Sequence, residues 1–163
     1  MPVDSNALRA TMRQWVTGVT VVTTVHEGVR AGMTVSSFTS VSLEPPTVLV
    51  CLNKTTFAHA QAEKSGVYAV SLLANGQEAI SNRFAGIDPA ITDRFEGIEI
   101  AAAETGSPLI VGAVGWLDCV VRAAHDAGTH TIFIGEVVFA QAGPEGVPLV
   151  YYNRKYQRME PLG

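Results

Sequence analysis

The stretch from residue 32 to residue 53, GMTVSSFTSVSLEPPTVLVCLN, constrains the fold of this chain more than any other. It ends in an unbroken apolar run, Val48 to Leu52, directly before Asn53. The pair Pro45-Pro46 precedes that run, and because proline cannot donate a ladder hydrogen bond, the pair belongs at a strand start or a corner. The first half is rich in small hydroxyl side chains: Thr34, Ser36, Ser37, Thr39, Ser40 and Ser42. The segment therefore predicts two β-strands with a hydroxyl-lined face, which is either an ordinary solvated barrel wall or a surface that hydrogen-bonds an oxygen-rich ligand.

Short strands separated by turn residues fill most of the remaining chain. We predict strands over 19–25, 29–35, 48–52, 67–73, 113–123, 131–140 and 148–152. Helices are expected before Gly18, from Thr55 or Thr56 to about Lys64, after a capping box at Asn75, and after Asp88-Pro89. The run from Val48 to Leu52 is expected to be covered on both faces. The pattern predicts a mainly β fold with peripheral helices, in the form of a closed antiparallel barrel that leaves no exposed edge.

Composition excludes several classes of protein. The 163 residues predict one domain over 1–163, and the formal charge of −4 argues against nucleic-acid binding because a basic surface is missing. No apolar run approaches the length that crosses a bilayer, and the N-terminus lacks the features of a signal peptide, so no membrane association and a cytoplasmic location are expected. Cys51 and Cys119 both lie in apolar strands and are expected to be buried thiols. The absence of CxxC and HxxxH patterns argues against a metal site.

The segment after Asn53 is a candidate binding site for an anion. Thr55 or Thr56 can cap a helix, and a helix N-terminus that follows a strand offers free N–H groups and a partial positive charge to a phosphate. Lys54 adds a positive charge at the same place. For these residues alone, an ordinary capped helix is the simpler explanation.

Four segments in this order resemble the flavin reductase-like family, the small reductase components of two-component flavin monooxygenases. They are the hydroxyl segment above, Gly18-Val19-Thr20-Val21-Val22-Thr23-Thr24, Asn82-Arg83-Phe84-Ala85-Gly86, and Gly128-Thr129-His130-Thr131-Ile132-Phe133-Ile134-Gly135-Glu136-Val137. The resemblance spans roughly residues 8 to 157. It implies an FMN-binding split β-barrel with Greek-key features and peripheral helices.

The resemblance also implies which residues contact the flavin. The ring and ribityl chain are expected against one group of residues: Thr34, Val35, Ser36, Ser37, Cys51, Leu52 and Asn53. The terminal phosphate is expected near Thr55, Thr56 and Arg83, because the planar guanidinium of arginine matches phosphate oxygens. Phe84 is expected to flank the ring or the adenine of FAD, and Tyr152 and Tyr156 to close the pocket or to be core aromatics.

His130 is the single candidate for a catalytic residue. It follows the small residues Gly128-Thr129 and precedes an apolar strand, so the backbone should aim its ring, although a structural role is also compatible with this position. In the family the equivalent histidine lies over the nicotinamide side of the flavin. The family commonly has Gly-Asp-His where this chain has Gly-Thr-His, so Thr129 can keep a hydrogen bond to the ring but not the charge.

The resemblance implies an NAD(P)H-dependent flavin reductase. It would transfer a hydride from NADH or NADPH to FMN or FAD, act as a homodimer, and supply reduced flavin to a separate flavin-dependent monooxygenase. Hydride transfer between two stacked cofactors needs no protein nucleophile, and the chain has no Ser-His-Asp or paired-carboxylate pattern. Two alternatives remain, a flavin-binding electron-transfer module and a flavin oxidase of the same barrel superfamily, neither of which uses nicotinamide.

Overall fold

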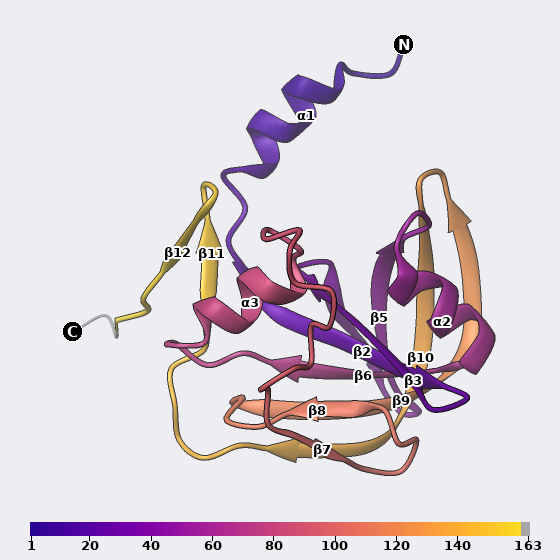
Figure 1. Cartoon of the computed structure of the whole chain (residues 1–163). Helices are drawn as coiled ribbons and strands as arrows, with labels where there is room; N and C mark the ends of the chain where they lie inside the picture. The colour runs from indigo at the N-terminus through magenta and orange to yellow at the C-terminus, as the bar shows by residue number, and fades with distance from the viewer. Residues whose placement is uncertain (161–163) are drawn as a thin grey trace.

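The main element of the fold is an antiparallel sheet of seven strands in the order β3-β2-β6-β9-β10-β5-β4 (Figure 1). The computed structural model describes residues 1–160, so the last three residues of the predicted domain lie outside the described part. In chain order the seven strands are β2 (Thr20–His26), β3 (Val29–Val35), β4 (Phe38–Leu43), β5 (Pro46–Asn53), β6 (Val67–Leu72), β9 (Gly115–Ala127) and β10 (His130–Ala142). The mainly β fold is thereby confirmed.

Short strands and helices surround this sheet. A second sheet contains β1 (Thr17–Gly18), β11 (Val150–Tyr152) and β12 (Lys155–Gln157), and a third contains β7 (Ile100–Ala102) and β8 (Pro108–Ile110). The helices within residues 1–160 are α1 (Ser5–Met12), α2 (Phe57–Ser65) and α3 (Glu78–Phe84). None of these helices is both long and apolar enough to span a membrane.

The path of the chain through the sheet is of the Greek-key type. Hairpins form β2–β3, β4–β5 and β9–β10, and the connection through α2 carries the chain from β5 back to β6, which pairs with β2. The β2–β3 turn holds Glu27 and Gly28 at φ 49° and 78°, the two positive values that a tight hairpin turn requires. His125 belongs to β9 and pairs with Ile132.

The barrel is split rather than closed by hydrogen bonds. The end strands β3 and β4 follow one another in the chain, joined by the corner Ser36-Ser37, and within residues 1–160 no ladder pairs them. The closed barrel that the strand pattern predicted is therefore wrong, whereas the split β-barrel that the resemblance implied is confirmed. Edge strands keep unpaired N–H and C=O groups, so the split leaves backbone donors and acceptors available to a ligand.

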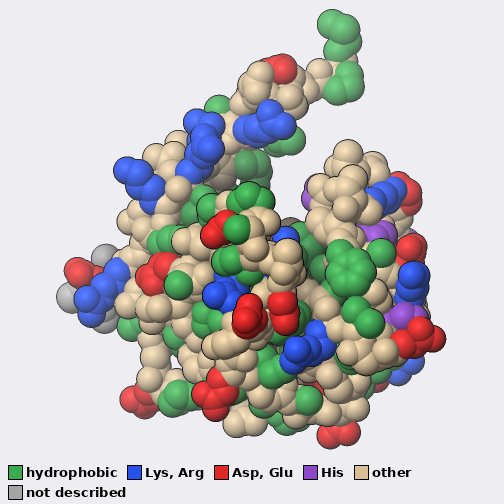
Figure 2. All heavy atoms as spheres, in the orientation of Figure 1, with side chains coloured by type: hydrophobic (Ala, Val, Ile, Leu, Met, Phe, Trp, Pro, Cys, Tyr) green, Lys and Arg blue, Asp and Glu red, His purple; other side chains and the backbone are tan. Residues whose placement is uncertain are grey.

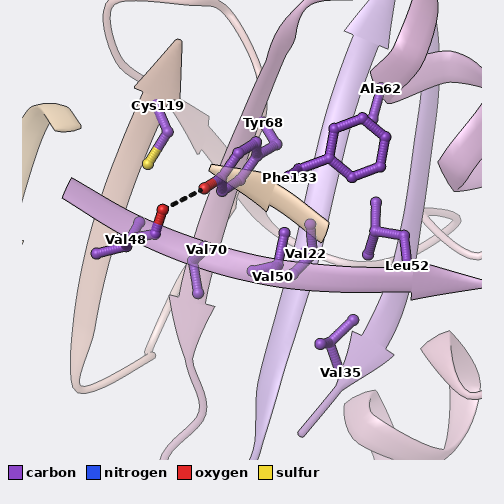
Figure 3. Packing of buried hydrophobic residues seen from close by; sticks show 10 residues of the cluster. All are labelled: Val22, Val35, Val48, Val50, Leu52, Ala62, Tyr68, Val70, Cys119 and Phe133. Atoms are coloured by element: carbon purple, nitrogen blue, oxygen red, sulfur yellow. Dashed lines mark hydrogen bonds between the residues drawn. The ribbon is translucent and has the colours of Figure 1, made fainter. Parts of the chain in front are cut away.

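One apolar cluster fills the inside of the curled sheet. Figure 3 shows Val35 of β3, Val50 of β5 and Phe133 of β10 on this interior, and Ala62 of α2 contributes from one end. Tyr68 and Cys119 lie in the same cluster, and the Tyr68 hydroxyl donates to the Val48 carbonyl at 3.2 Å. Burial raises the pKa of the Cys119 thiol to about 12, so this cysteine is an inert core residue.

A second cluster lies on the outer face of β2. Consecutive residues Val21 and Val22 belong to different clusters, because neighbouring side chains of a strand point to opposite faces. Phe84 of α3 and Phe95 pack in the outer cluster. The segment after Asp88 forms turns rather than the predicted short helix, since the Asp88 carboxylate accepts from the Ala90 N–H and closes a local turn.

The N-termini of the helices differ from one another. Asp4 caps α1 through its carboxylate, and α1 ends at Met12 and contains no buried residue. Figure 2 shows basic and hydrophobic side chains exposed along this projecting segment. Thr56 caps α2, whereas the predicted capping box of α3 does not form, because Gln77 stands at the N-cap and its side chain does not bond the N–H groups of the helix.

Candidate functional site

The end of β5 and the beginning of β10 form a polar surface on the outside of the barrel. Asn53 lies directly opposite His130 in the ladder, and both are half-buried. Side chains directly opposite each other in a ladder are neighbours on one face of the sheet. Cys51 lies on the same face two residues earlier, and Ser37 of the corner exchanges hydrogen bonds with it: Ser37 Oγ donates to the Cys51 carbonyl at 3.0 Å, and the Cys51 N–H donates to the Ser37 carbonyl at 3.3 Å.

His130 is held by its neighbours in a defined orientation. Its Nδ1 is 2.9 Å from the Thr129 hydroxyl, so the hydrogen bond expected of this threonine is present. The next residue, Thr131, points inward and bonds the Nε2 of His59 at 2.8 Å, which ties β10 to α2. Within residues 1–160 no hydrogen bond engages the Nε2 of His130. That nitrogen is therefore available to an incoming ligand.

Asn53 organises the turn into α2. Its Oδ1 accepts from both the N–H and the hydroxyl of Thr55, each at 2.9 Å, so the side-chain amide keeps its Nδ2 as a donor toward a ligand. The Thr56 hydroxyl donates to the Asn53 carbonyl at 2.7 Å and accepts from the His59 N–H at 3.3 Å. These bonds fix the N-terminus of α2 next to the end of β5.

The N-terminus of α2 borders a cavity of about 530 Å³, which we call the arginine cavity. It is lined by residues 30–32, 55–58 and 91–95. Arg94 donates from Nη1 to the carbonyls of Gly32 and Phe84 at 3.1 and 2.9 Å. These two bonds do not use its Nε and Nη2 groups. Arg30 is exposed and stacks over Phe95, with 5.1 Å between its Cζ and the ring centroid.

A second cavity, of about 320 Å³, lies further along β3, and we call it the hydroxyl cavity. It is lined by Val19, Thr34, Ser36, Ser81, Asn82, Ala85, Ile87, Tyr151, Arg154 and Tyr156. The Thr34 hydroxyl is already used, because it donates to the Ser81 carbonyl at 2.6 Å, whereas Ser36 is exposed. Gly32 and Thr34 are only roughly 7 Å apart along the strand. The two cavities therefore lie on neighbouring parts of β3.

Several residues that the resemblance assigned to flavin belong to the core instead. Phe84 has no exposed surface and packs edge-on against Phe95, with centroids 5.0 Å apart, so its ring cannot flank a flavin. Val35 and Leu52 point into the barrel, with 4% and 1% of their surface exposed, so only their backbone groups remain as contacts. The period of two along β3 and β5 is the reason, since every second side chain must face inward.

The assignment of Arg83 needs correction because of where α3 lies. Arg83 donates to the Glu96 carbonyl and borders a different hollow, with Ile80 and Ile98, rather than the N-terminus of α2. Arg94 lines the cavity at the N-terminus of α2 instead. It belongs to an irregular segment, in which no spacing of residues indicates that position. Tyr152 donates to Gln14 at 3.0 Å, while Tyr151 and Tyr156 line the hydroxyl cavity.

Comparison with known proteins identifies the family. Residues 12–160 match the family model described as "Flavin reductase like domain". The chain is 37% identical over 159 residues to the reductase subunit HsaB of a flavin-dependent monooxygenase from Rhodococcus jostii, a match that covers 98% of this chain and 80% of that protein. It is 41% identical over 138 residues to the FMN reductase (NADH) RutF of Ancylobacter novellus, covering 85% of this chain and 76% of that protein.

A solved structure agrees with these sequence matches. The NADH:FAD oxidoreductase SgcE6 of Streptomyces globisporus C-1027, in complex with NAD and FAD fragments, superimposes with a TM-score of 0.89 at 37% identity. The match covers 99% of this chain and 98% of that chain. The split barrel, the family model and these relatives agree, and the chain belongs to the flavin reductase-like family.

Proposed function

We propose that this protein is an NAD(P)H:flavin oxidoreductase that reduces FMN or FAD with NADH or NADPH. The observation that carries the proposal is that Asn53 and His130 stand side by side in the β5–β10 ladder, with Asn53 three residues before Thr56, the N-cap of α2 at the arginine cavity. The polar surface suits the polar edges of a flavin ring, and the guanidinium groups beside it suit the phosphate to which that ring is joined. The relationship to HsaB, RutF and SgcE6 supports the same activity.

The described residues fit a flavin nucleotide. Asn53 keeps a free amide donor, and Ser36 and Ser37 offer exposed hydroxyls beside the unpaired edge of β3. Arg94 and the first N–H groups of α2 provide donors for a phosphate at the N-terminus of α2. A bound flavin supplies the hydride acceptor, so the protein has to hold the two cofactors in contact and exclude water.

His130 is the residue that we assign to the nicotinamide side. Thr129 holds Nδ1, which leaves Nε2 to hydrogen-bond the carboxamide of the nicotinamide. The threonine hydroxyl replaces the carboxylate that is common in the family, so the ring keeps its orientation without an adjacent negative charge. The physical role of His130 in this assignment is to align the dihydropyridine, which is a contribution to binding geometry.

The activity is tested by mixing the purified protein with FMN or FAD and NADH or NADPH under anaerobic conditions and recording flavin absorbance. We expect catalytic bleaching that requires nicotinamide. His130→Ala should lower kcat/KM for the nicotinamide by about five- to tenfold, the size of one lost hydrogen bond, with flavin affinity unchanged within about twofold. A protein that binds flavin but bleaches it with neither nicotinamide is an electron-transfer module, and oxygen uptake without nicotinamide identifies an oxidase.

The product is proposed to serve a separate flavin-dependent monooxygenase. HsaB is named as the reductase subunit of such a monooxygenase, which supports this partner class for the present chain. Both cysteines are free thiols, which suits the reducing cytoplasm, and fractionation of the producing cells tests this location. The match over residues 12–160 supports a single flavin reductase-like domain.

A homodimer is also part of the proposal. An isolated helix as short as α1 is marginal in water, and α1 contains no buried residue of its own. Exposed apolar side chains continue beyond it, with Trp15 66% and Val16 54% exposed. A second copy of the chain that packs on this segment accounts for both features. Sedimentation equilibrium should give a dimer that Trp15→Glu weakens at least tenfold, whereas a monomeric wild-type protein at micromolar concentration contradicts the proposal.

A further inference from the structure

We propose that Phe57 is the platform on which the adenine of FAD stacks, so that the chain binds FAD more tightly than FMN. The inference rests on the proposed flavin reductase function and extends it, because neither the hydroxyl segment nor His130 distinguishes the two flavins. It is carried by an exposed aromatic ring at the rim of the arginine cavity.

Phe57 is placed where packing does not require it. It is the first residue of α2, and 60% of its surface is exposed, whereas the next two residues of the helix, Ala58 and His59, are buried. Those two residues attach the helix to the barrel, and the Thr56 hydroxyl caps it. Phe57 also lines the arginine cavity. A large apolar ring that is open to solvent beside a polar cavity is suited to stack on the flat face of a base.

The charges around the cavity fit a dinucleotide better than a mononucleotide. Arg94 is anchored near Gly32, and Arg30 stands two residues earlier on β3, so the cavity has two separate guanidinium groups. FAD carries its negative charge on two linked phosphates, and each guanidinium can pair with one of them. Asp93, which also lines the cavity, accepts the Phe95 N–H through Oδ1 and keeps Oδ2 for a ribose hydroxyl or an adenine amino group.

The order of these groups places the adenine beyond the phosphates. The hydroxyl and amide groups proposed to contact the flavin ring lie around Ser37 and Asn53, and the phosphate donors lie at the N-terminus of α2 and at Arg94. Phe57 comes after Asn53 along the chain, at the first position of α2, and lines the same cavity as Arg94. FMN ends at the phosphate and therefore leaves Phe57 uncovered, whereas FAD continues onto it.

The test compares ligands on one set of variants by titration calorimetry with FAD, FMN and ADP, with no nicotinamide present. We expect FAD to bind wild-type protein at least fivefold more tightly than FMN, and Phe57→Ala to weaken FAD by about 5- to 150-fold, the range for one base stacked on an aromatic ring. FMN affinity should change less than twofold. Phe57→Leu keeps an apolar side chain without an aromatic face and should weaken FAD similarly, whereas Phe57→Trp should retain FAD binding.

Each outcome decides the inference. ADP should bind the wild-type protein and lose affinity in Phe57→Ala in parallel with FAD. Equal loss for FAD and FMN, or an unchanged FAD affinity in Phe57→Ala, overturns the adenine platform while the reductase proposal stands. Failure of the wild-type protein to bind either flavin overturns the proposed function itself.

Discussion

Phe84→Ala is expected to lower the free energy of unfolding by about 3–5 kcal/mol, the usual cost of removing a buried phenyl ring. Phe84 has no exposed surface, packs against Phe95 and fills the space above Gly32, where an added Cβ would lie 2.8 Å from its Cε1. The loss of the ring leaves a cavity between α3 and β3. Urea denaturation followed by circular dichroism measures the change.

Phe84→Leu is the matched variant, because it keeps most of the apolar volume and should cost less than Phe84→Ala. We also expect Phe84→Leu to bind FMN and FAD like the wild-type protein. If Phe84→Ala left the stability unchanged and weakened only flavin binding, the ring would be a ligand contact, as the family resemblance implied, and the described packing of α3 would be wrong.

The strands of this protein were predictable because their signals are local. The turn at Glu27-Gly28 and the alternation on either side of it define the β2–β3 hairpin without tertiary information. The five-residue apolar run from Val48 to Leu52 was less informative, because the alternation is hidden when every residue is apolar. The structure shows Val48, Val50 and Leu52 buried while Leu49 and Cys51 are half-buried, so only one face of β5 belongs to the core.

The position of Arg94 at the arginine cavity was not predictable for a different reason. Arg83 and Arg94 are eleven positions apart, and the irregular path of the chain after α3 decides which of them reaches β3. The side chains of turn residues do not alternate with a fixed period, so the direction of each side chain cannot be predicted from its spacing. The resemblance favoured Arg83 because a recognised motif contains it, whereas the contact of Arg94 with the Gly32 carbonyl exists only in three dimensions.

Arg94→Ala is accordingly expected to weaken flavin binding by about 10- to 150-fold, which corresponds to one lost charge-assisted hydrogen bond of about 1.5–3 kcal/mol. Arg83→Ala is the matched control, since it removes the same charge from a side chain bonded to the Glu96 carbonyl and away from α2. Its flavin affinity should stay within about twofold of the wild-type value. Quenching of flavin fluorescence measures both dissociation constants.

Stability has to be separated from binding in this comparison. Arg94 also satisfies the Gly32 and Phe84 carbonyls, so Arg94→Ala should destabilise the fold by about 1–3 kcal/mol as well. Binding is therefore measured well below the thermal midpoint of each variant, where the protein remains folded. A strong loss of flavin affinity in Arg83→Ala with none in Arg94→Ala would assign the phosphate to α3 and leave the arginine cavity without its ligand.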